Sequence, residues 1–396
     1  MKRFIIIVID SFGVGAMDDC AKVRPSDVGA NTAAHLIGNE KLHLKNLESL
    51  GLMNAIGFEI GEMKFAPAPA YAVSRLAHFG ADTFQGHQEI MGTKPKAPVF
   101  EALADHIDEL EKDLLAENYS VKRYSLNGNT ALIVNDCIFI GDNMETDAGQ
   151  VINVSATFAK TTFEKTKKVG AIVRRHYKVS RIIALGGEDV DFGKILASAE
   201  TKGRFVGLDT PKSGVYEKGY LVQHIGYGVE PNEQVNKHLN DIGVETYMYG
   251  KAADIIANDR GVNFCGVDTA YLLNKLIDDL SIVEKDAFFC LNVQETDLAG
   301  HRCDAKGYAD ILKIVDEKLG EILAKLKKDD CLIVMADHGN DPYSGSSLHT
   351  RENVPILIKN DNIEKRFYGL RDTMADVGQT AAKYFGTELK NGKAIF

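Results

Sequence analysis

Acidic residues and histidines follow three short apolar runs of the sequence, at the points where buried strands would end. The runs cover residues 4–9, 287–293 and 332–336. The residues after them that could bind a metal are Asp10, Asp297, His301, Asp337 and His338. Carboxylate and imidazole groups without a thiolate suit divalent ions such as Mn²⁺, Zn²⁺ or Mg²⁺. Five ligands are too many for one four-coordinate ion, so they indicate two neighbouring ions, a pair suited to phosphoryl displacement.

Each of these residues also has an ordinary explanation. An aspartate after a strand commonly caps a helix or stabilises a turn, and a histidine beside an aspartate is commonly part of a structural pair. The combination is harder to explain in this way, because Asp-His follows one run, D-x-x-G-H follows another and a third run ends in Asp. The joint pattern therefore favours a metal site.

The apolar runs have the character of strands in a parallel sheet. They are short, rich in Ile, Val, Leu and Phe, and not interrupted by alternating polar residues, which is typical of strands buried on both faces. Between the last two runs, apolar residues recur at spacings of three and four over 305–327, which predicts an amphipathic helix. This order predicts a βαβ unit in an α/β fold. Ligands bind beyond the carboxyl ends of strands in such sheets, so we expect the acids and histidines to meet at one edge.

The middle of the chain predicts a second, smaller α/β unit with alternating segments, a basic helical stretch and further strand-like runs. Turn-forming residues flank this region, in TKPKAP at 93–98 and in GYGVEPN at 226–232. We therefore expect a core built from residues 1–97 and 229–396, with residues 98–228 inserted as a cap domain.

Thr83 is the candidate nucleophile, in the glycine-flanked segment GADTFQGH that follows a strand-like run. A threonine at the start of a helix has its hydroxyl near the positive end of the helix dipole and near free backbone amides. A metal ion beside it would lower the pKa of the hydroxyl and help it attack phosphorus. On local grounds, Thr83 or Asp82 could equally be a simple helix cap.

Four motifs together resemble the phosphopentomutase family of the alkaline phosphatase superfamily. They are IDSFGVG near the start, GADT at 80–83, YGKAADI at 249–255 and ADHGNDPYSGSSLHTREN at 336–353. The resemblance implies an alkaline-phosphatase-like core, with a mostly parallel sheet flanked by helices, and a smaller inserted α/β cap. It also implies an enzyme that exchanges phosphate between positions 1 and 5 of ribose or deoxyribose, through a phosphothreonine and a sugar bisphosphate.

The resemblance further implies roles for individual residues. Thr83 would accept the phosphoryl group, and Asp147 would be a cap acid that faces the sugar. Two divalent ions are implied, with Mn²⁺ expected and Mg²⁺ or Zn²⁺ as alternatives. The ion nearer Thr83 would be held by Asp10, Asp337 and His338, and the other by Asp297, His301 and His349. The expected partners are a small phosphorylated sugar and a sugar bisphosphate activator.

The sequence departs from the family pattern beside the nucleophile and in the cap. Near Thr83 it has Ala81, Gln85 and Gln88 where the family has Lys, Thr and Trp. In the cap, Leu185 stands where an arginine would follow the strand, and GLDTPKSGVY offers only Lys212, which does not reproduce a planar arginine fork.

Because of these departures, the alternatives are a mutase for another phosphosugar or a metal-dependent phosphohydrolase of the same superfamily. A catalytically silent phosphate-binding protein is a third reading. That reading predicts the loss of a ligand, and all six ligands and Thr83 are present.

The composition of the chain limits the classes of partner that it is expected to bind. There are 46 Lys and Arg against 56 Asp and Glu, a net charge of −10, which disfavours nucleic acid and anionic membranes. The apolar run after MKR ends at Asp10 and is too short for a signal peptide or a membrane span. We therefore expect a cytoplasmic protein.

Overall fold

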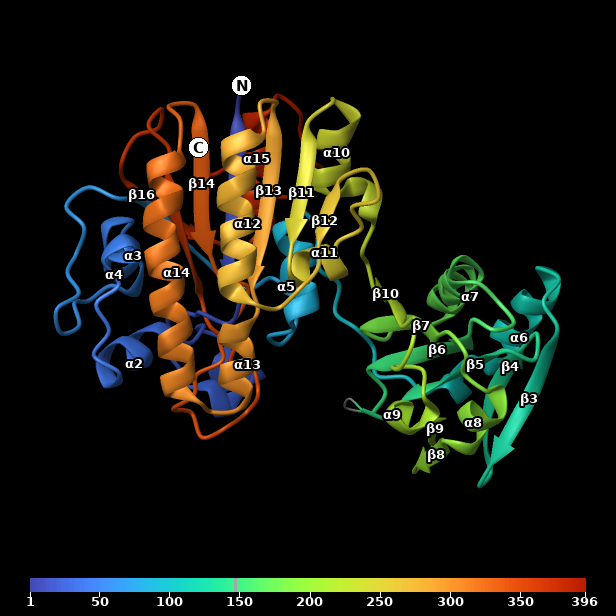
Figure 1. Cartoon of the computed structure of the whole chain (residues 1–396). Coiled ribbons are helices and arrows are strands. Elements are labelled where there is room, and N and C mark those ends of the chain that lie inside the picture. Colours follow the sequence, from blue (N-terminus) through green and yellow to red (C-terminus); the bar gives the residue numbers. More distant parts are fainter. Residues whose placement is uncertain (146–147) are drawn as a thin grey trace. The chain divides into compact units, whose positions relative to one another are not determined.

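The computed structural model describes residues 1–145 and 148–396 (Figure 1). Asp147, the predicted cap acid, lies outside the described residues. The chain forms two compact units: a core unit of Met1–Pro95 and Glu230–Phe396, and a cap unit of Lys96–Val229. The catalytic and cap roles that the resemblance assigns to these units stay predictions.

The core unit is built on one eight-stranded sheet in the order β12-β11-β13-β1-β14-β15-β2-β16. The three predicted strands lie together at its centre, where β1 (Arg3–Ile9) pairs in parallel with β13 (Ala287–Val293) on one side and β14 (Asp330–Met335) on the other. Two of the pairings, β14 with β15 and β15 with β2, are antiparallel. The remaining strands are β2 (Ala70–Ser74), β11 (Glu245–Tyr249), β12 (Val262–Phe264), β15 (Val354–Lys359) and β16 (Phe367–Arg371).

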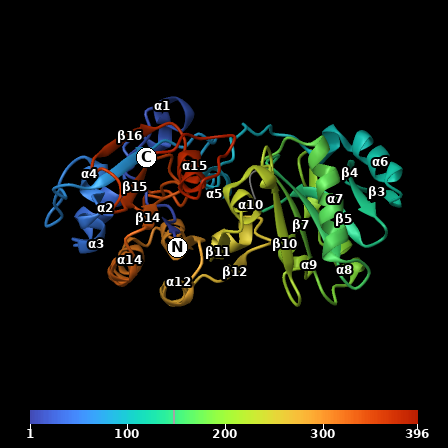
Figure 2. The same cartoon turned by 90° about the horizontal axis from the view of Figure 1, so that it is seen from above.

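Helices cover both faces of this sheet. Figures 1 and 2 show α12 (Thr269–Ile282) and α14 (Ala305–Lys325) against one face, and α10 (Val235–Asp241) and α15 (Ala375–Tyr384) against the other. The shorter helices are α1 (Cys20–Val23), α2 (Thr32–Asn39), α3 (Lys45–Ser49), α4 (Leu52–Ile56), α5 (Thr83–Ile90), α11 (Lys251–Ile255) and α13 (Glu295–His301), with single 3₁₀ turns at Pro25–Asp27 and Pro231–Glu233.

Burial explains why the central strands read as continuous apolar runs. Every residue of β1 is at most 1% exposed, and β13 and β14 are buried along their whole length. Each fully buried Ile, Leu or Phe side chain contributes roughly 1.5–3 kcal/mol relative to an exposed one. These strands therefore form a rigid base, and their carboxyl ends lie at one edge because the pairing is parallel and in register.

The cap unit has its own sheet in the order β10-β7-β6-β5-β4-β3, with β9 added beside β5 and β8 paired to β9. The basic stretch of the sequence forms α7 (Phe163–His176), which packs on β6 and β7, while α6 (Ile107–Ala116) packs on α7. The strands are β3 (Val121–Leu126), β4 (Asn129–Val134), β5 (Ile138–Asn143), β6 (Val151–Thr157), β7 (Arg181–Gly187), β8 (Ala199–Lys202), β9 (Phe205–Leu208) and β10 (Leu221–Gly226), and the other helices are α8 (Phe192–Ala197), α9 (Thr210–Ser213) and a 3₁₀ turn at Leu103–Asp105.

The predicted fold class is confirmed: the chain is an α/β protein whose main sheet is mostly parallel and flanked by helices. The expected helix over 305–327 ends two residues earlier, at Lys325. Among the described residues, no helix combines the length and the apolar character that crossing a membrane requires.

Candidate active site

The predicted ligands converge on the carboxyl edge of the core sheet. Asp10 follows β1 directly, and Asp337 and His338 follow β14. Asp297 and His301 lie one turn apart on α13, which starts just after β13. Parallel pairing of the three strands thus brings together residues that are far apart in the sequence.

One group of ligand atoms belongs to Asp10, Asp337 and His338. His338 Nε2 lies 3.4 Å from Asp10 Oδ1 and 3.3 Å from Asp337 Oδ2, and all three side chains are fully buried. Thr83 Oγ1 donates to Asp337 Oδ2 at 2.7 Å. The candidate nucleophile is therefore in direct contact with this group.

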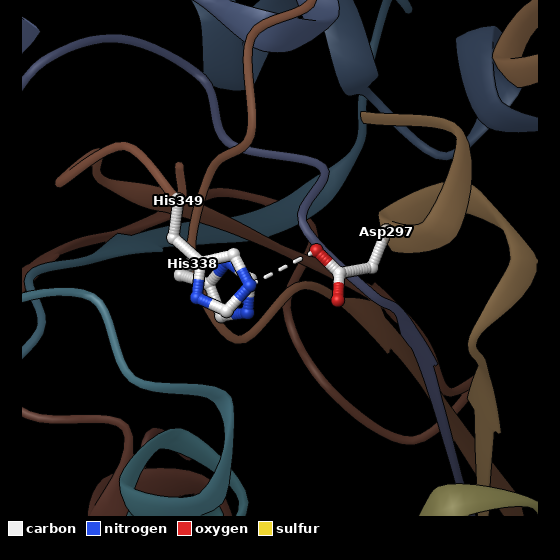
Figure 3. A group of neighbouring side chains, drawn as sticks. All are labelled: Asp297, His338 and His349. Carbon is white, nitrogen blue, oxygen red and sulfur yellow. Dashed lines mark ion pairs between the residues drawn. The ribbon is translucent and has the colours of Figure 1, made fainter. Parts of the chain in front are cut away.

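A second group is formed by Asp297, His338 and His349 (Figure 3). Asp297 Oδ1 lies 3.2 Å from His349 Nε2, the ion pair drawn in Figure 3. His301 joins from the outer side, with Nε2 at 3.3 Å from Asp297 Oδ2 and 3.0 Å from His349 Nε2. His338 thus borders both groups.

The histidine ring orientations fit a metal centre. The Nδ1 atoms of His301, His338 and His349 face the backbone carbonyls of Ser347, Gly339 and Ala81 at 2.6, 2.9 and 2.7 Å. A carbonyl only accepts, so each Nδ1 carries the hydrogen and each Nε2 of a neutral ring presents a lone pair to the site. Fixing the tautomer in this way is the usual support for a metal-binding histidine.

Unsatisfied atoms strengthen this fit. Asp10 Oδ1 and His338 Nε2 are buried and have no hydrogen-bond partner, and the two Nε2 lone pairs of His301 and His349 face each other. Buried polar groups normally have partners. Divalent cations would satisfy all of these atoms at once, and the residues present therefore fit the metals that the sequence predicts.

The charges in the site are strongly coupled. Burial alone would lower the pKa of His338, but Asp337 and Asp10 outweigh it and raise the pKa to about 10. Burial would raise the pKa of Asp297, but the histidines beside it hold that pKa far below its usual range. The carboxylates and histidines of the site therefore stabilise one another's charges.

Lys251 supplies a fixed positive charge between the two groups. Its Nζ lies 2.6 Å from Asp10 Oδ2, 3.5 Å from Asp297 Oδ2 and 3.2 Å from Thr83 Oγ1. Burial would lower the pKa of Lys251, but the surrounding carboxylates raise it. The ammonium group therefore stays charged next to the candidate nucleophile.

Sequence reasoning assigned no role to Lys251, Asn292 or His87, all of which contact the site. Asn292 donates to Asp10 Oδ2 at 2.8 Å, and His87 contacts Asn292 Oδ1 and Asp337 Oδ2. Two signals were available. Lys251 follows the end of β11 just as the predicted ligands follow their strands, and Asn292 is the one polar residue in the apolar run AFFCLNV.

Two glycines allow close approach at the site. A Cβ on Gly86 would lie 3.1 Å from both Cβ and the carbonyl oxygen of Asp337, so this residue lets α5 bring Thr83 close to Asp337. A Cβ on Gly300 would lie 2.6 Å from Asn340 Cγ, and Asn340 Nδ2 donates to Asp297 Oδ1 at 3.1 Å. The glycine of the D-x-x-G-H motif is therefore required for the packing that orients its aspartate.

Comparisons with known proteins agree with this geometry. The family model described as "Metalloenzyme superfamily" matches residues 2–389. A curated phosphopentomutase from Actinobacillus succinogenes is 31% identical over 413 aligned residues, which cover 100% of both chains. The chain belongs to the metalloenzyme superfamily and, within it, to the phosphopentomutase family.

A solved structure shares the fold of this family member. Leishmania mexicana phosphoglycerate mutase, determined at low cobalt concentration, aligns with 99% of this chain and 97% of its own at a TM-score of 0.50 and 13% identity. At that identity the likeness concerns the fold alone. The full-length match to a curated relative makes the chain a phosphomutase of the metalloenzyme superfamily, a metal-dependent isomerase.

The cap of this phosphomutase differs from its core in how it uses charge. Leu185, at the position where the resemblance places an arginine, is 1% exposed and packs in the cap's apolar cluster. Lys212 lies in α9, is exposed and pairs with Asp209, the residue that caps that helix. Neither residue thus offers an arginine-like grip for a second phosphate.

Proposed function

We propose that the chain interconverts the 1-phosphate and 5-phosphate of ribose or deoxyribose through a phosphothreonine at Thr83. The observation that carries this proposal is the position of the Thr83 hydroxyl, which donates to Asp337 and accepts from Lys251 at the border of the two ligand groups. The match to a curated phosphopentomutase along the whole chain supports the same substrate class.

The residues of the chain prepare Thr83 for attack. Asp82 caps α5 by accepting from the backbone N–H of Gln85 at 2.8 Å, which fixes Thr83 as the first helical residue. The hydroxyl proton points at Asp337 Oδ2, which holds it, and the Lys251 ammonium stabilises the negative charge that develops on Oγ1.

Asp10, Asp337 and His338 would hold one divalent ion, and Asp297, His301 and His349 the other, with Mn²⁺ as the expected metal. When bound, these ions neutralise charge on the transferring phosphoryl group and lower the pKa of the threonine hydroxyl. Asn292 and Asn340 support the arrangement, because each donates to one of the aspartates.

The proposed cycle has two transfers. Phospho-Thr83 gives its phosphoryl group to the free hydroxyl of a sugar monophosphate. The bond from phosphorus to Oγ1 breaks, a bond from phosphorus to the sugar oxygen forms, and the proton lost by the sugar hydroxyl restores the hydroxyl of Thr83, so that a sugar bisphosphate results. The bisphosphate turns round and returns its other phosphate to Thr83. A sugar bisphosphate would therefore act as the activator that first loads the enzyme.

The cap departures support a second candidate, a mutase for another phosphosugar or a phosphohydrolase. A hydrolase differs only in letting water reach the phosphothreonine. The buried Leu185 and the paired Lys212 are the observations that favour keeping this alternative.

A product-resolved screen tests these candidates. The purified protein is incubated with Mn²⁺, a trace of the matching sugar bisphosphate and each sugar 1-phosphate in turn, and both the phosphosugars and free phosphate are measured. We expect ribose or deoxyribose 1-phosphate to become the 5-phosphate without release of phosphate. Conversion of a different sugar would establish the other mutase, and free phosphate as the main product would establish the hydrolase.

A further inference from the structure

The backbone that leads to Thr83 is irregular. Charged side chains, rather than a neighbouring strand, form hydrogen bonds with its backbone groups. After β2 ends at Ser74, the amides of Ala77 and His78 donate to the two carboxylate oxygens of Glu89, each at 3.2 Å. Glu89 is itself fully buried. One side of this loop is therefore held through its N–H groups.

Arg351 holds the other side of the loop through its carbonyl groups. Its Nη1 donates to the carbonyls of His78 and Gly80 at 2.8 and 2.6 Å, and its Nη2 donates to that of Leu76 at 3.2 Å. The remaining N–H groups donate to Asp19 at 2.9 Å. Every N–H of the guanidinium thus has an acceptor, and the residue is 6% exposed.

Arg351 lies two residues after His349, and both face the same loop. His349 Nδ1 contacts the carbonyl of Ala81 at 2.7 Å, two residues before Thr83. Thr350, between them, forms an isolated antiparallel bridge with Gly339, so its neighbours on either side point the same way. One short segment therefore carries a candidate metal ligand and also clamps the backbone before the nucleophile.

We propose that Arg351 is a positioning residue that fixes Thr83 relative to the ligand group containing His349. It does so by clamping the carbonyls of Leu76, His78 and Gly80, and Asp19 anchors the guanidinium in turn. The proposal rests on the proposed function only in taking Thr83 as the phosphoryl acceptor.

The chemistry of arginine makes this role specific. A planar guanidinium can donate in several fixed directions at once, whereas a lysine ammonium cannot span three carbonyls and a carboxylate in the same geometry. A buried carbonyl that loses its donor is destabilising, so the loop would relax if the fork were lost. Displacing a reacting group by about 1 Å can reduce a rate on the order of 100-fold.

The test compares Arg351→Lys with Arg371→Lys as a matched control. Arg371 is an arginine of the core unit that is less buried than Arg351, and it donates to Asp376 at 2.6 Å and to the carbonyl of Lys393 at 3.2 Å. Three quantities are measured in each protein: the rate of Thr83 phosphorylation by a sugar bisphosphate, the bound Mn²⁺, and hydrogen exchange by mass spectrometry.

For Arg351→Lys we expect phosphorylation to slow by about 10- to 100-fold, with bound Mn²⁺ unchanged and faster exchange confined to the peptide over residues 76–83. The control should match the wild type in all three quantities. Unchanged exchange over 76–83, or faster exchange there without a slower rate, overturns the proposal. The proposal is also overturned if slower phosphorylation is accompanied by loss of bound Mn²⁺ and by faster exchange throughout the core unit.

Asp19→Asn keeps the question decidable if Arg351→Lys does not fold. It leaves the arginine in place but removes its charged anchor, and we expect the same local exchange with a rate reduced several-fold. No change in either quantity would overturn the proposal. If wild-type Thr83 takes up no phosphate, the proposed function fails, while the exchange over 76–83 still decides whether Arg351 clamps the loop.

Discussion

The core unit gathers charged side chains into one cluster around the candidate metal ligands, and many charged side chains of the cap unit form separate exposed pairs. In the core, three aspartates, His338, His349 and Lys251 converge at buried or partly buried positions, the exposed His301 joins them, and Asp337 and Lys251 contact Thr83. In the cap, several arginines pair with acids at exposed positions, as in Arg123 with Glu111 and Arg204 with Asp105. Exposed pairs of this kind contribute little to stability, about 0–1 kcal/mol each.

This difference separates the two halves of the proposed activity. Concentrated, mutually compensating charge in the core is what phosphoryl transfer requires, and these are the residues to which the family resemblance assigns the metal site. The cap has an apolar residue at the position where a phosphate-gripping arginine is expected. We therefore expect the phosphoryl-transfer chemistry to follow the family and the recognition of the substrate to differ from it.

The largest expected effect belongs to Asp337→Asn in the core. Asp337 accepts from Thr83 and from the backbone N–H of Ser11 at 3.1 Å, and contacts His338. Removing its charge should abolish metal uptake and lower turnover by about 1,000-fold or more. Metal analysis and phosphosugar turnover are the measurements.

Asp316→Asn is the matched control for that variant. Asp316 is also a buried aspartate of the core, but it accepts from the backbone of Asn46 and Leu47. The Asp316→Asn protein should be somewhat less stable than the wild type and should still bind its metal. Mn²⁺-dependent turnover retained in Asp337→Asn would refute the ligand assignment.

Leu185→Arg is the corresponding change in the cap. Because Leu185 is buried in the apolar cluster of the cap, an arginine there should destabilise the cap by about 3 kcal/mol or more. Core metal uptake should be unaffected. Leu221→Arg, at an exposed position on the adjacent strand β10, should be nearly neutral.

In both variants, hydrogen exchange of cap peptides measures the stability of the cap, and metal analysis measures the metal bound by the core. A Leu185→Arg protein with a stable cap and tighter binding of a sugar bisphosphate would show that this position faces the ligand. That result would remove the contrast between core and cap.

Lys251→Met is expected to have a smaller effect, on rate alone. Loss of the ammonium beside Thr83 should lower the rate of phosphorylation on the order of 100-fold, while Mn²⁺ binding is retained or tightened because a competing cation is gone. Lys275→Met is the control. Lys275 Nζ pairs with Asp279 Oδ1 at a distance of 2.6 Å, and this pair involves none of the candidate site residues. Loss of metal in Lys251→Met would contradict the assigned role.

The smallest effect concerns Asp142 in the cap and the pH dependence of its stability. Asp142 accepts from the amides of Leu103 and Val206 at 2.8 and 2.9 Å, but burial outweighs them and raises its pKa from 3.8 to about 6. Below that pKa the folded cap binds a proton that the unfolded chain does not bind until near pH 3.8. This group should therefore stabilise the cap by about 1 kcal/mol more at pH 5 than at pH 7.

Asp142→Asn isolates that contribution. Exchange of cap peptides is followed at both pH values, and the difference between wild type and variant is the quantity of interest. The stability of the wild-type cap relative to that of the variant should be greater at pH 5 than at pH 7. A difference that does not change with pH would mean that the Asp142 carboxyl has an ordinary pKa in the folded cap.

Much of the fold and of the ligand set could be predicted from the sequence. Apolar runs buried on both faces mark parallel strands, and the carboxyl-edge rule then brings Asp10, Asp297 and Asp337 together. The structure places all of these residues at one edge, with Thr83 beside them. Their catalytic roles remain predictions.

Other features depend on contacts that no local pattern reveals. Arg351 clamps backbone more than 270 residues away in sequence, and the carbonyls that fix the histidine tautomers belong to irregular segments. The orientation of Leu185 could not be predicted from the sequence either, because polar and apolar residues do not alternate regularly along β7, which reads RIIALGG.

The most direct test of the account is to locate the phosphate on the enzyme. Wild type and Thr83→Val are incubated with Mn²⁺ and ribose 1,5-bisphosphate, digested and analysed by peptide mass spectrometry. The account predicts one phosphate on the peptide containing Thr83 in the wild type, and none in the variant. Phosphate on another residue, or no phosphate with any sugar bisphosphate, would contradict it.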